Sequence, residues 1–199
     1  MTTRQKVLKA IYPAFMWWTK RKISTGKSIS SIKKITPPVS FYSLKDSTID
    51  GTAFNFSELK GKKVLLVNTA SDCGYTGQYD ELEKLFRQCK GKLVIVGFPA
   101  NDFKEQEKGT NEEIEWFCKN NYAVTFPLMK KSIVVKNSAQ NEVFKWLTDS
   151  TRNGWNDRQP AWNFSKYLVN EAGELVNYFA PVISPLSKEI TNAVEDKKE

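Results

Sequence analysis

Hydrophobic residues follow two different spacings along the chain, one typical of buried strands and one typical of amphipathic helices. Residues 63–70 and 92–98 are continuous apolar runs rich in β-branched side chains, which predict two buried strands. Between them, residues 79–89 carry apolar side chains at helical spacing and charged side chains elsewhere, so we expect an amphipathic helix there. A strand, a helix and a second strand in this order predict a βαβ unit.

The rest of the pattern predicts further helices and strands in alternation. We expect a hairpin at residues 41–56, helices at 110–120, 141–150 and 187–195, and two strands within 167–179. The first of these helices begins with a capping box formed by Thr110 and Glu113. Residues 124–129 are also typical of a strand, but Pro127 places them at an edge or a bend. The alternation predicts an α/β fold in which helices flank a central sheet.

Charge is distributed unevenly along the chain of 199 residues, which has a net charge of +8. Residues 1–36 contain nine Lys and Arg and no acidic residue, whereas the remainder holds 21 cations and 22 acidic residues. We therefore divide the chain into a basic, aromatic N-terminal arm, residues 1–36, and one folded domain, residues 37–199, which begins at Pro37-Pro38. The basic character says nothing about the chemistry of the domain.

The arm contains an apolar segment, residues 7–18, that is shorter than the ~20 residues needed to span a bilayer. Its aromatic residues lie among lysines, a combination that suits contact with an anionic membrane surface: Tyr12, Phe15, Trp17 and Trp18. The alternative, that the arm packs on the domain or has no fixed structure, stays open. A cleaved secretory signal is less favoured because a small-residue cleavage site is missing. No base-reading module accompanies the charge, so we expect no nucleic-acid partner.

The chain has no histidine, which excludes histidine metal sites and Cys-His catalytic pairs, and we predict neither a metal nor a cofactor. Of its three cysteines, Cys73 lies between a predicted strand and a predicted helix. A helix N-terminus lowers the pKa of a thiol, so Cys73 is a candidate nucleophile, with a structural role as the equal alternative. Cys89 and Cys118 complete apolar helix faces, and their spacing alone favours packing in the core.

Several ordered motifs are more specific than this periodicity. They are residues 61–85 (GKKVLLVNTASDCGYTGQYDELEKL), residues 97–114 (GFPANDFKEQEKGTNEEI), Phe126-Pro127, Trp162-Asn163-Phe164 and Pro185-Leu186-Ser187. Together they closely resemble the glutathione peroxidase family, over residues 39–190. The resemblance implies a thioredoxin-like fold with a central mixed sheet, and a thiol peroxidase that takes part in the response to oxidative stress.

The resemblance also implies roles for five residues of this chain. Cys73 falls on the peroxidatic position, and Gln106, Trp162 and Asn163 fall on the glutamine, tryptophan and asparagine of the family's active site. Cys118 coincides with the resolving cysteine of the thioredoxin-dependent branch. The implied reaction reduces hydrogen peroxide and organic or lipid hydroperoxides, leaving a sulfenic acid on Cys73 that Cys118 resolves as a disulfide.

The sequence departs from its relatives at positions that bear on reductant and assembly. Ala100 stands where relatives often carry a further cysteine, and Lys108 replaces a common proline. The segment between residues 136 and 162 is short, as in monomeric relatives. We therefore expect a monomer that uses thioredoxin rather than glutathione, in the cytoplasm or at the inner face of the membrane. A peroxide sensor or relay that passes the oxidation of Cys73 to a partner protein is the alternative function.

Overall fold

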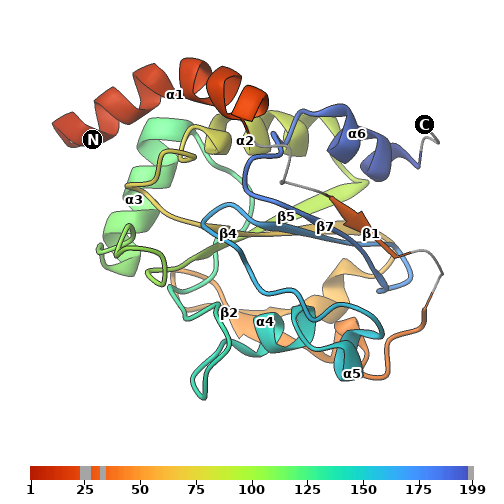
Figure 1. Ribbon diagram of the computed structural model, residues 1–199. Coiled ribbons are helices and arrows are strands. Elements are labelled where there is room, and N and C mark those ends of the chain that lie inside the picture. Colours follow the sequence, from red (N-terminus) through yellow and green to blue (C-terminus); the bar gives the residue numbers. More distant parts are fainter. Residues whose placement is uncertain (23–27, 32–34, 197–199) are drawn as a thin grey trace.

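A mixed sheet of five strands forms the centre of the domain (Figure 1). The structure, a computed structural model, describes residues 1–22, 28–31 and 35–196, without the side chains of residues 17–22. In spatial order the strands are β1 (Ile29–Ser30), β7 (Leu175–Phe179), β6 (Lys166–Val169), β4 (Lys63–Thr69) and β5 (Leu93–Pro99). Strands β4 and β5 are parallel and the other neighbours are antiparallel. The predicted α/β fold with a central mixed sheet flanked by helices is confirmed.

Strand β4 is buried along all of its seven residues and supplies both halves of the hydrophobic core. Leu65 and Val67 point to one face of the sheet, and Val64 and Leu66 point to the other. This alternation is the two-residue period of a strand, and full burial on both faces explains why its sequence is a continuous apolar run. The end of β4 therefore has a fixed position from which the following loop starts.

Three helices cover the first face of the sheet, at the top and left of Figure 1. They are α2 (Gln78–Gln88), α3 (Asn111–Tyr122) and α6 (Lys188–Glu195). Helix α2 closes the βαβ unit between β4 and β5, as the sequence predicts. Helix α3 begins with the predicted capping box, in which Thr110 and Glu113 bond to each other's backbone amides.

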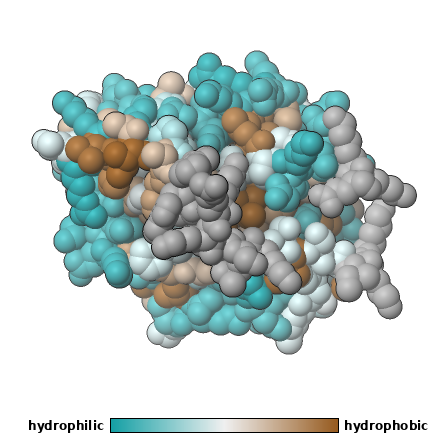
Figure 2. Space-filling view, turned by 45° about the horizontal axis from the view of Figure 1, so that its top comes forward, coloured by the Kyte–Doolittle hydropathy of each residue, from teal (hydrophilic) through white to brown (hydrophobic). Residues whose placement is uncertain are grey.

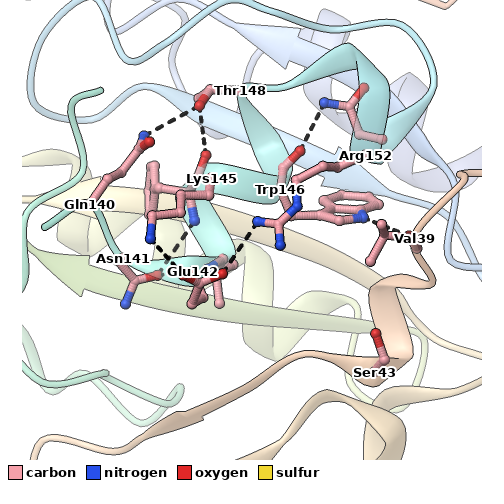
Figure 3. Close-up of polar contacts among 12 residues, drawn as sticks. Val39, Ser43, Gln140, Asn141, Glu142, Lys145, Trp146, Thr148 and Arg152 are labelled. Carbon is pink, nitrogen blue, oxygen red and sulfur yellow. Dashed lines mark hydrogen bonds and ion pairs between the residues drawn. The ribbon is translucent and has the colours of Figure 1, made fainter. Parts of the chain in front are cut away.

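The opposite face is covered by short elements at the bottom of Figure 1. They are η1 (Phe41–Ser43), η2 (Phe56–Leu59), the hairpin of β2 (Lys45–Ser47) and β3 (Ala53–Asn55), and helices α4 (Glu142–Leu147) and α5 (Ser150–Asn153). The start of the domain is fixed here, because the Trp146 indole donates a hydrogen bond to the Val39 carbonyl at 2.7 Å (Figure 3). Glu142 pairs with Lys145 and Arg152 beside this contact.

Two predicted elements differ from the structure. The single helix expected at residues 141–150 is two helices, because Asp149 is extended (φ −134°) and caps α5 through its own side chain. The strand expected at residues 124–129 is wrong for that whole segment, of which only Leu128 and Met129 form isolated bridges. Pro127 lacks the amide that a continuous ladder requires, which explains the interruption.

The N-terminal arm contains a long helix, α1 (Thr3–Lys22), that the sequence does not predict. It lies along the top of the domain beside α2 (Figure 1), where the Tyr12 hydroxyl donates to Glu81 at 3.0 Å. Tyr12 is buried and the Phe15 ring meets Tyr75, so these two aromatics face the domain rather than solvent. In the described part of the chain, no helix is long and apolar enough to cross a membrane. The domain boundary at residue 37 stays a prediction.

Candidate active site

The loop between β4 and α2 holds Cys73 in place through its own hydrogen bonds. The Thr76 hydroxyl accepts from the Cys73 amide at 3.1 Å and donates to the Ala70 carbonyl at 2.9 Å. The Tyr75 amide donates to the Cys73 sulfur at 3.4 Å. Because these bonds join residues two to six positions apart, the turn itself holds the backbone that carries the sulfur.

A second turn, residues 162–165, is clamped to strand β4 by Asn68. Its side-chain amide donates to the Trp162 carbonyl at 3.1 Å, and its side-chain oxygen accepts from the Ser165 amide at 3.0 Å. Phe164 sits in the left-handed region (φ +65°), a costly conformation for a residue other than glycine. The clamp therefore holds a strained turn, and that turn aims Trp162 and Asn163 toward the Cys73 loop.

A third segment brings Gln106 to the same place. Its carbonyl accepts from the Asp72 amide at 3.0 Å, and its side-chain oxygen accepts from the Asn163 side chain at 3.0 Å. The structure thus brings together four of the five residues that the sequence singles out. The Asn163 side-chain oxygen is buried and has no hydrogen-bond partner among the described residues. A peroxide O–H would supply the donor that this oxygen lacks.

The Cys73 thiol is only 1% exposed, and this burial raises its pKa above the usual value. Hydrogen bonds from the Tyr75 amide and the side chains of Asn163 and Trp162 oppose the shift, as does the charge of Arg4. The expectation that a helix N-terminus lowers this pKa is therefore wrong as a net effect. Removal of the sulfur from water outweighs the donors around it.

Cys118 lies on the buried face of α3 and its thiol is free, as are those of Cys73 and Cys89. Burial raises the pKa of Cys118 to about 12, and the Tyr79 hydroxyl beside it offsets only part of this rise. The resting structure does not join Cys118 to Cys73. Cys89, expected in the core, is only partly buried at the end of α2. Among the described residues, no three His, Cys, Asp or Glu side chains form a group that could hold a metal ion.

Comparison with known proteins decides the family of this chain. Residues 41–148 match the family model of glutathione peroxidase. A glutathione peroxidase-like peroxiredoxin, GPX5, of Chlamydomonas reinhardtii is 46% identical over 148 residues, which are 74% of this chain and 90% of the relative. The chain belongs to the glutathione peroxidase family. It is accordingly a peroxidase, an oxidoreductase that acts on peroxide through a cysteine thiol.

Other glutathione peroxidase relatives agree in sequence and in fold. Glutathione peroxidase-like peroxiredoxin 2 of Saccharomyces cerevisiae is 44% identical over 149 residues, covering 74% of this chain and 91% of the relative. The crystal structure described as Trgpx in apo form has a TM-score of 0.60 at 31% identity, covering 79% of this chain and 97% of that one. A DsbF homologue of Corynebacterium diphtheriae, 14% identical, has a TM-score of 0.61 over 88% of this chain and 96% of that one. Its likeness concerns the fold alone, and with the glutathione peroxidase structures it confirms the thioredoxin-like fold.

Sequence patterns alone do not reveal the residues that support this glutathione peroxidase site. Glu107, next to Gln106, is buried and accepts from the Ser71 hydroxyl at 3.1 Å, and burial raises its pKa to about 8. Lys166 is also buried, donates to the carbonyls of Phe164 and Ile183, and has its pKa lowered by burial to about 7. In each case the informative signal is a charged residue within an apolar or motif segment, which becomes meaningful only once its burial is known.

We expect Asn68→Ala to slow the oxidation of Cys73 by peroxide, although Asn68 acts only by holding the turn of Trp162 and Asn163. The substitution removes the bonds of Asn68 to the Ser165 amide and the Trp162 carbonyl, at a cost of about 0.5–1.5 kcal/mol per hydrogen bond, and it frees the turn that carries Asn163. Stopped-flow oxidation of Cys73 and urea unfolding measure the two effects. Asn55→Ala, at a surface hydrogen bond to Glu58, is the matched control. An unchanged oxidation rate in Asn68→Ala would contradict the clamp.

The raised pKa of Glu107 predicts how stability depends on pH. Between about pH 4.5 and pH 8 the unfolded chain loses the Glu107 proton while the folded chain keeps it. This carboxyl therefore lowers the free energy of unfolding as pH rises, by up to about 1.4 kcal/mol per pH unit. Glu107→Gln should remove that slope, measured by urea unfolding of the reduced protein across this range. The exposed Glu58→Gln serves as control, and an equal slope in Glu107→Gln and wild type argues against the shift.

Proposed function

We propose that this peroxidase consumes hydroperoxides at Cys73, resolves the oxidised sulfur with Cys118 and is recycled by thioredoxin. The observation that carries the proposal is the set of donors around one buried thiol: the Tyr75 amide and the side chains of Trp162 and Asn163. Donors fixed in advance around a sulfur stabilise the thiolate and the developing charge on a peroxide oxygen. None of them needs to exchange a proton, which suits a chain without histidine.

The first step oxidises Cys73. Its thiolate attacks the terminal oxygen of the hydroperoxide, an S–O bond forms, and the O–O bond breaks. The leaving oxygen takes a proton and departs as water or an alcohol, and Cys73 becomes a sulfenic acid. Because the pKa of Cys73 is raised, the thiolate is the minor form at neutral pH, and the rate of this step should rise as pH increases toward that pKa.

The second step joins Cys73 to Cys118. The Cys118 sulfur attacks the sulfenic sulfur, an S–S bond forms, the S–O bond breaks, and water leaves. Cys118 is fully buried with a strongly raised pKa, so it is unreactive until part of α3 opens. We infer that the last turns of α3 are the part that opens, because Cys118 lies nearer to that end of the helix than to its capped start at Thr110.

The third step returns two electrons from a dithiol. Thioredoxin, rather than glutathione, is the reductant we propose, because a disulfide within the chain is a substrate for a dithiol. The names of the relatives in Chlamydomonas and yeast, which are called peroxiredoxins, support a cysteine mechanism of this type. Ala100 is buried where a further cysteine often stands, which leaves Cys118 as the resolving candidate.

Steady-state assays of NADPH oxidation test the cycle, with thioredoxin and its reductase in one arm and glutathione and its reductase in the other. Wild type should turn over with thioredoxin, and Cys73→Ser should not. Cys118→Ser should still consume about one peroxide per chain but lose more than about ten-fold of thioredoxin turnover, because the sulfenic acid has no resolving thiol.

Cys89→Ser is the matched control, since Cys89 lies outside the site and should not affect cycling. Mass spectrometry of the oxidised wild type should find a Cys73–Cys118 disulfide. Normal cycling in Cys118→Ser would overturn the resolving role. Fast oxidation of Cys73 with little turnover under either reductant would instead favour the peroxide sensor or relay.

We also propose that α1 brings the enzyme to an anionic membrane surface on the cytoplasmic side. Val7 and Ile11 are 53% and 49% exposed, unusual for aliphatic residues, and basic residues lie along the same helix. Figure 2, which brings the top of Figure 1 forward, shows hydrophobic atoms open to solvent on this side. The three free thiols fit a reducing compartment, and we propose that the protein is a monomer there.

Sedimentation with vesicles tests the membrane proposal. The full chain should sediment with vesicles that contain phosphatidylserine and less with pure phosphatidylcholine, and Val7→Ser/Ile11→Ser should reduce the bound fraction several-fold. Ile133→Ser, another exposed aliphatic residue but away from α1, is the control. Equal binding of the double variant and the control would remove the proposal. Analytical ultracentrifugation without vesicles measures whether the chain is a monomer.

A further inference from the structure

Helix α1 is docked on the two elements that carry the reactive cysteines. The Tyr12 ring lies against Gly77 at the start of α2, so closely that a Cβ there would overlap it, and Phe15 packs against Gly74. About one turn earlier in the helix, the Lys9 ammonium donates to the Asn121 carbonyl of α3 at 2.6 Å. These contacts fix the position and rotation of α1 relative to the Cys73 loop.

The start of the chain and the first turn of α1 also form a wall beside the active-site loops. Met1, Thr2 and Gln5 share a cavity of about 430 Å³ with residues of the site, including Asp72 and Gln106. This stretch lies outside the residues that match the family model, so the glutathione peroxidase motifs say nothing about it. The docked helix therefore adds residues to the site that the family motifs do not include.

Arg4 is a cation that the docked helix brings to the nucleophile's loop. Its guanidinium donates to the Asp72 carbonyl at 3.4 Å, one residue before Cys73. It is also the cation whose charge acts on the thiol of Cys73. The guanidinium does not need to touch the sulfur, because a positive charge nearby favours a thiolate over a neutral thiol.

We propose that Arg4, held on the Asp72 carbonyl by docked α1, is a positioning residue of the active site that favours the Cys73 thiolate and so speeds the first attack on peroxide. The proposal rests on Cys73 as the peroxidatic residue. It assigns the basic arm a role in the reaction itself, beside any role in membrane contact.

The other charged and titratable groups around Cys73 do not duplicate this role. Those that face it or its immediate surroundings are Asp72 and Tyr75 of its own loop, Glu107 of the segment that carries Gln106, and Lys104, whose ammonium lies over the Trp162 ring at 5.9 Å. The first three are acids, which cannot favour a thiolate when ionised, and the contact of Lys104 is with the indole rather than with the loop of Cys73. Arg4 is thus the cation that acts on the sulfur among the described residues.

The pH profile of Cys73 tests this proposal on the full chain. Cys118→Ser serves as the background, so that only the first step is observed, and Cys73 is followed by iodoacetamide alkylation and by stopped-flow oxidation with hydrogen peroxide. Arg4→Gln should move the alkylation profile upward by about half a pH unit and slow both reactions about three-fold at neutral pH, since below its pKa the thiolate fraction changes ten-fold per unit. Arg4→Lys should restore most of the loss.

Two controls separate this effect from a change of net charge or of stability. Lys6→Gln removes the same charge from an exposed position of the same helix and should leave the profile unchanged. The difference between wild type and Arg4→Gln should shrink as salt rises toward about 1 M, because the Debye length then falls to about 3 Å. A profile of Arg4→Gln identical to that of wild type, or an equal shift in Lys6→Gln, would overturn the proposal.

A substitution outside α1 tests the docking itself. Gly77 has helical backbone angles (φ −59°, ψ −17°), so Ala is allowed there, but its Cβ would displace the Tyr12 ring. Gly77→Ala should slow the alkylation and oxidation of Cys73 as much as Arg4→Gln does, and the double variant should react no more slowly than either single one. If Cys73 reacts faster in Gly77→Ala than in wild type, α1 only shields the site from solvent, which contradicts the proposal. If Cys73→Ser loses all turnover but Arg4→Gln has no effect, the peroxidase function holds and the positioning role of Arg4 is wrong.

Discussion

Removal of the Cys73 sulfur from water is the constraint on which the rest of the site depends. A buried thiolate loses its hydration, so burial alone favours the neutral and unreactive thiol. The fold answers this cost with donors and charge from separate segments: the Tyr75 amide of its own loop, Trp162 and Asn163 of a strained turn, and Arg4 of α1. Contacts within the protein hold these groups before peroxide arrives: Asn68 holds the turn of Trp162 and Asn163, and the Asp72 carbonyl holds Arg4. The reactivity of Cys73 therefore depends on how rigidly these donors are held.

The hydrophobic pattern alone could predict most of the fold, because the signals for β4, α2 and α3 are local. A strand buried on both faces must be apolar throughout, and a capping box needs only Thr110 and Glu113 at the correct interval. The family motifs could likewise predict which side chains meet at Cys73. Neither source predicts how strongly the thiol is buried, since burial depends on segments that cover it from elsewhere in the chain. That is why the predicted direction of its pKa shift is wrong.

Helix α1 is a second feature that the local sequence does not predict, because it depends on a contact with a distant segment. Its inward face has apolar residues at helical spacing, Leu8, Tyr12, Phe15 and Met16, but Pro13 lies inside the helix and nine cations dominate the arm. Composition therefore favours an interfacial or unstructured segment. Docking becomes visible only with Gly77 opposite the Tyr12 ring, and this pairing joins positions far apart in the sequence. Here tertiary packing overrides a local signal.

Docking of α1 has opposite effects on the two proposed steps, because it supports the attack on peroxide and resists formation of the disulfide. The Lys9 ammonium bonds to the Asn121 carbonyl and lies 4.1 Å from the centre of the Tyr122 ring, both in the last turn of α3. In the proposed cycle that turn unwinds before Cys118 reaches Cys73, so disulfide formation would break the contacts that hold α1. By linkage, disulfide formation weakens docking by the same free energy with which docking resists the disulfide. Of these contacts, an exposed cation–π pair alone contributes about 0.5–1 kcal/mol, which is a factor of about two to five. If Arg4 acts as proposed, the arm favours the first attack on peroxide at a cost to resolution.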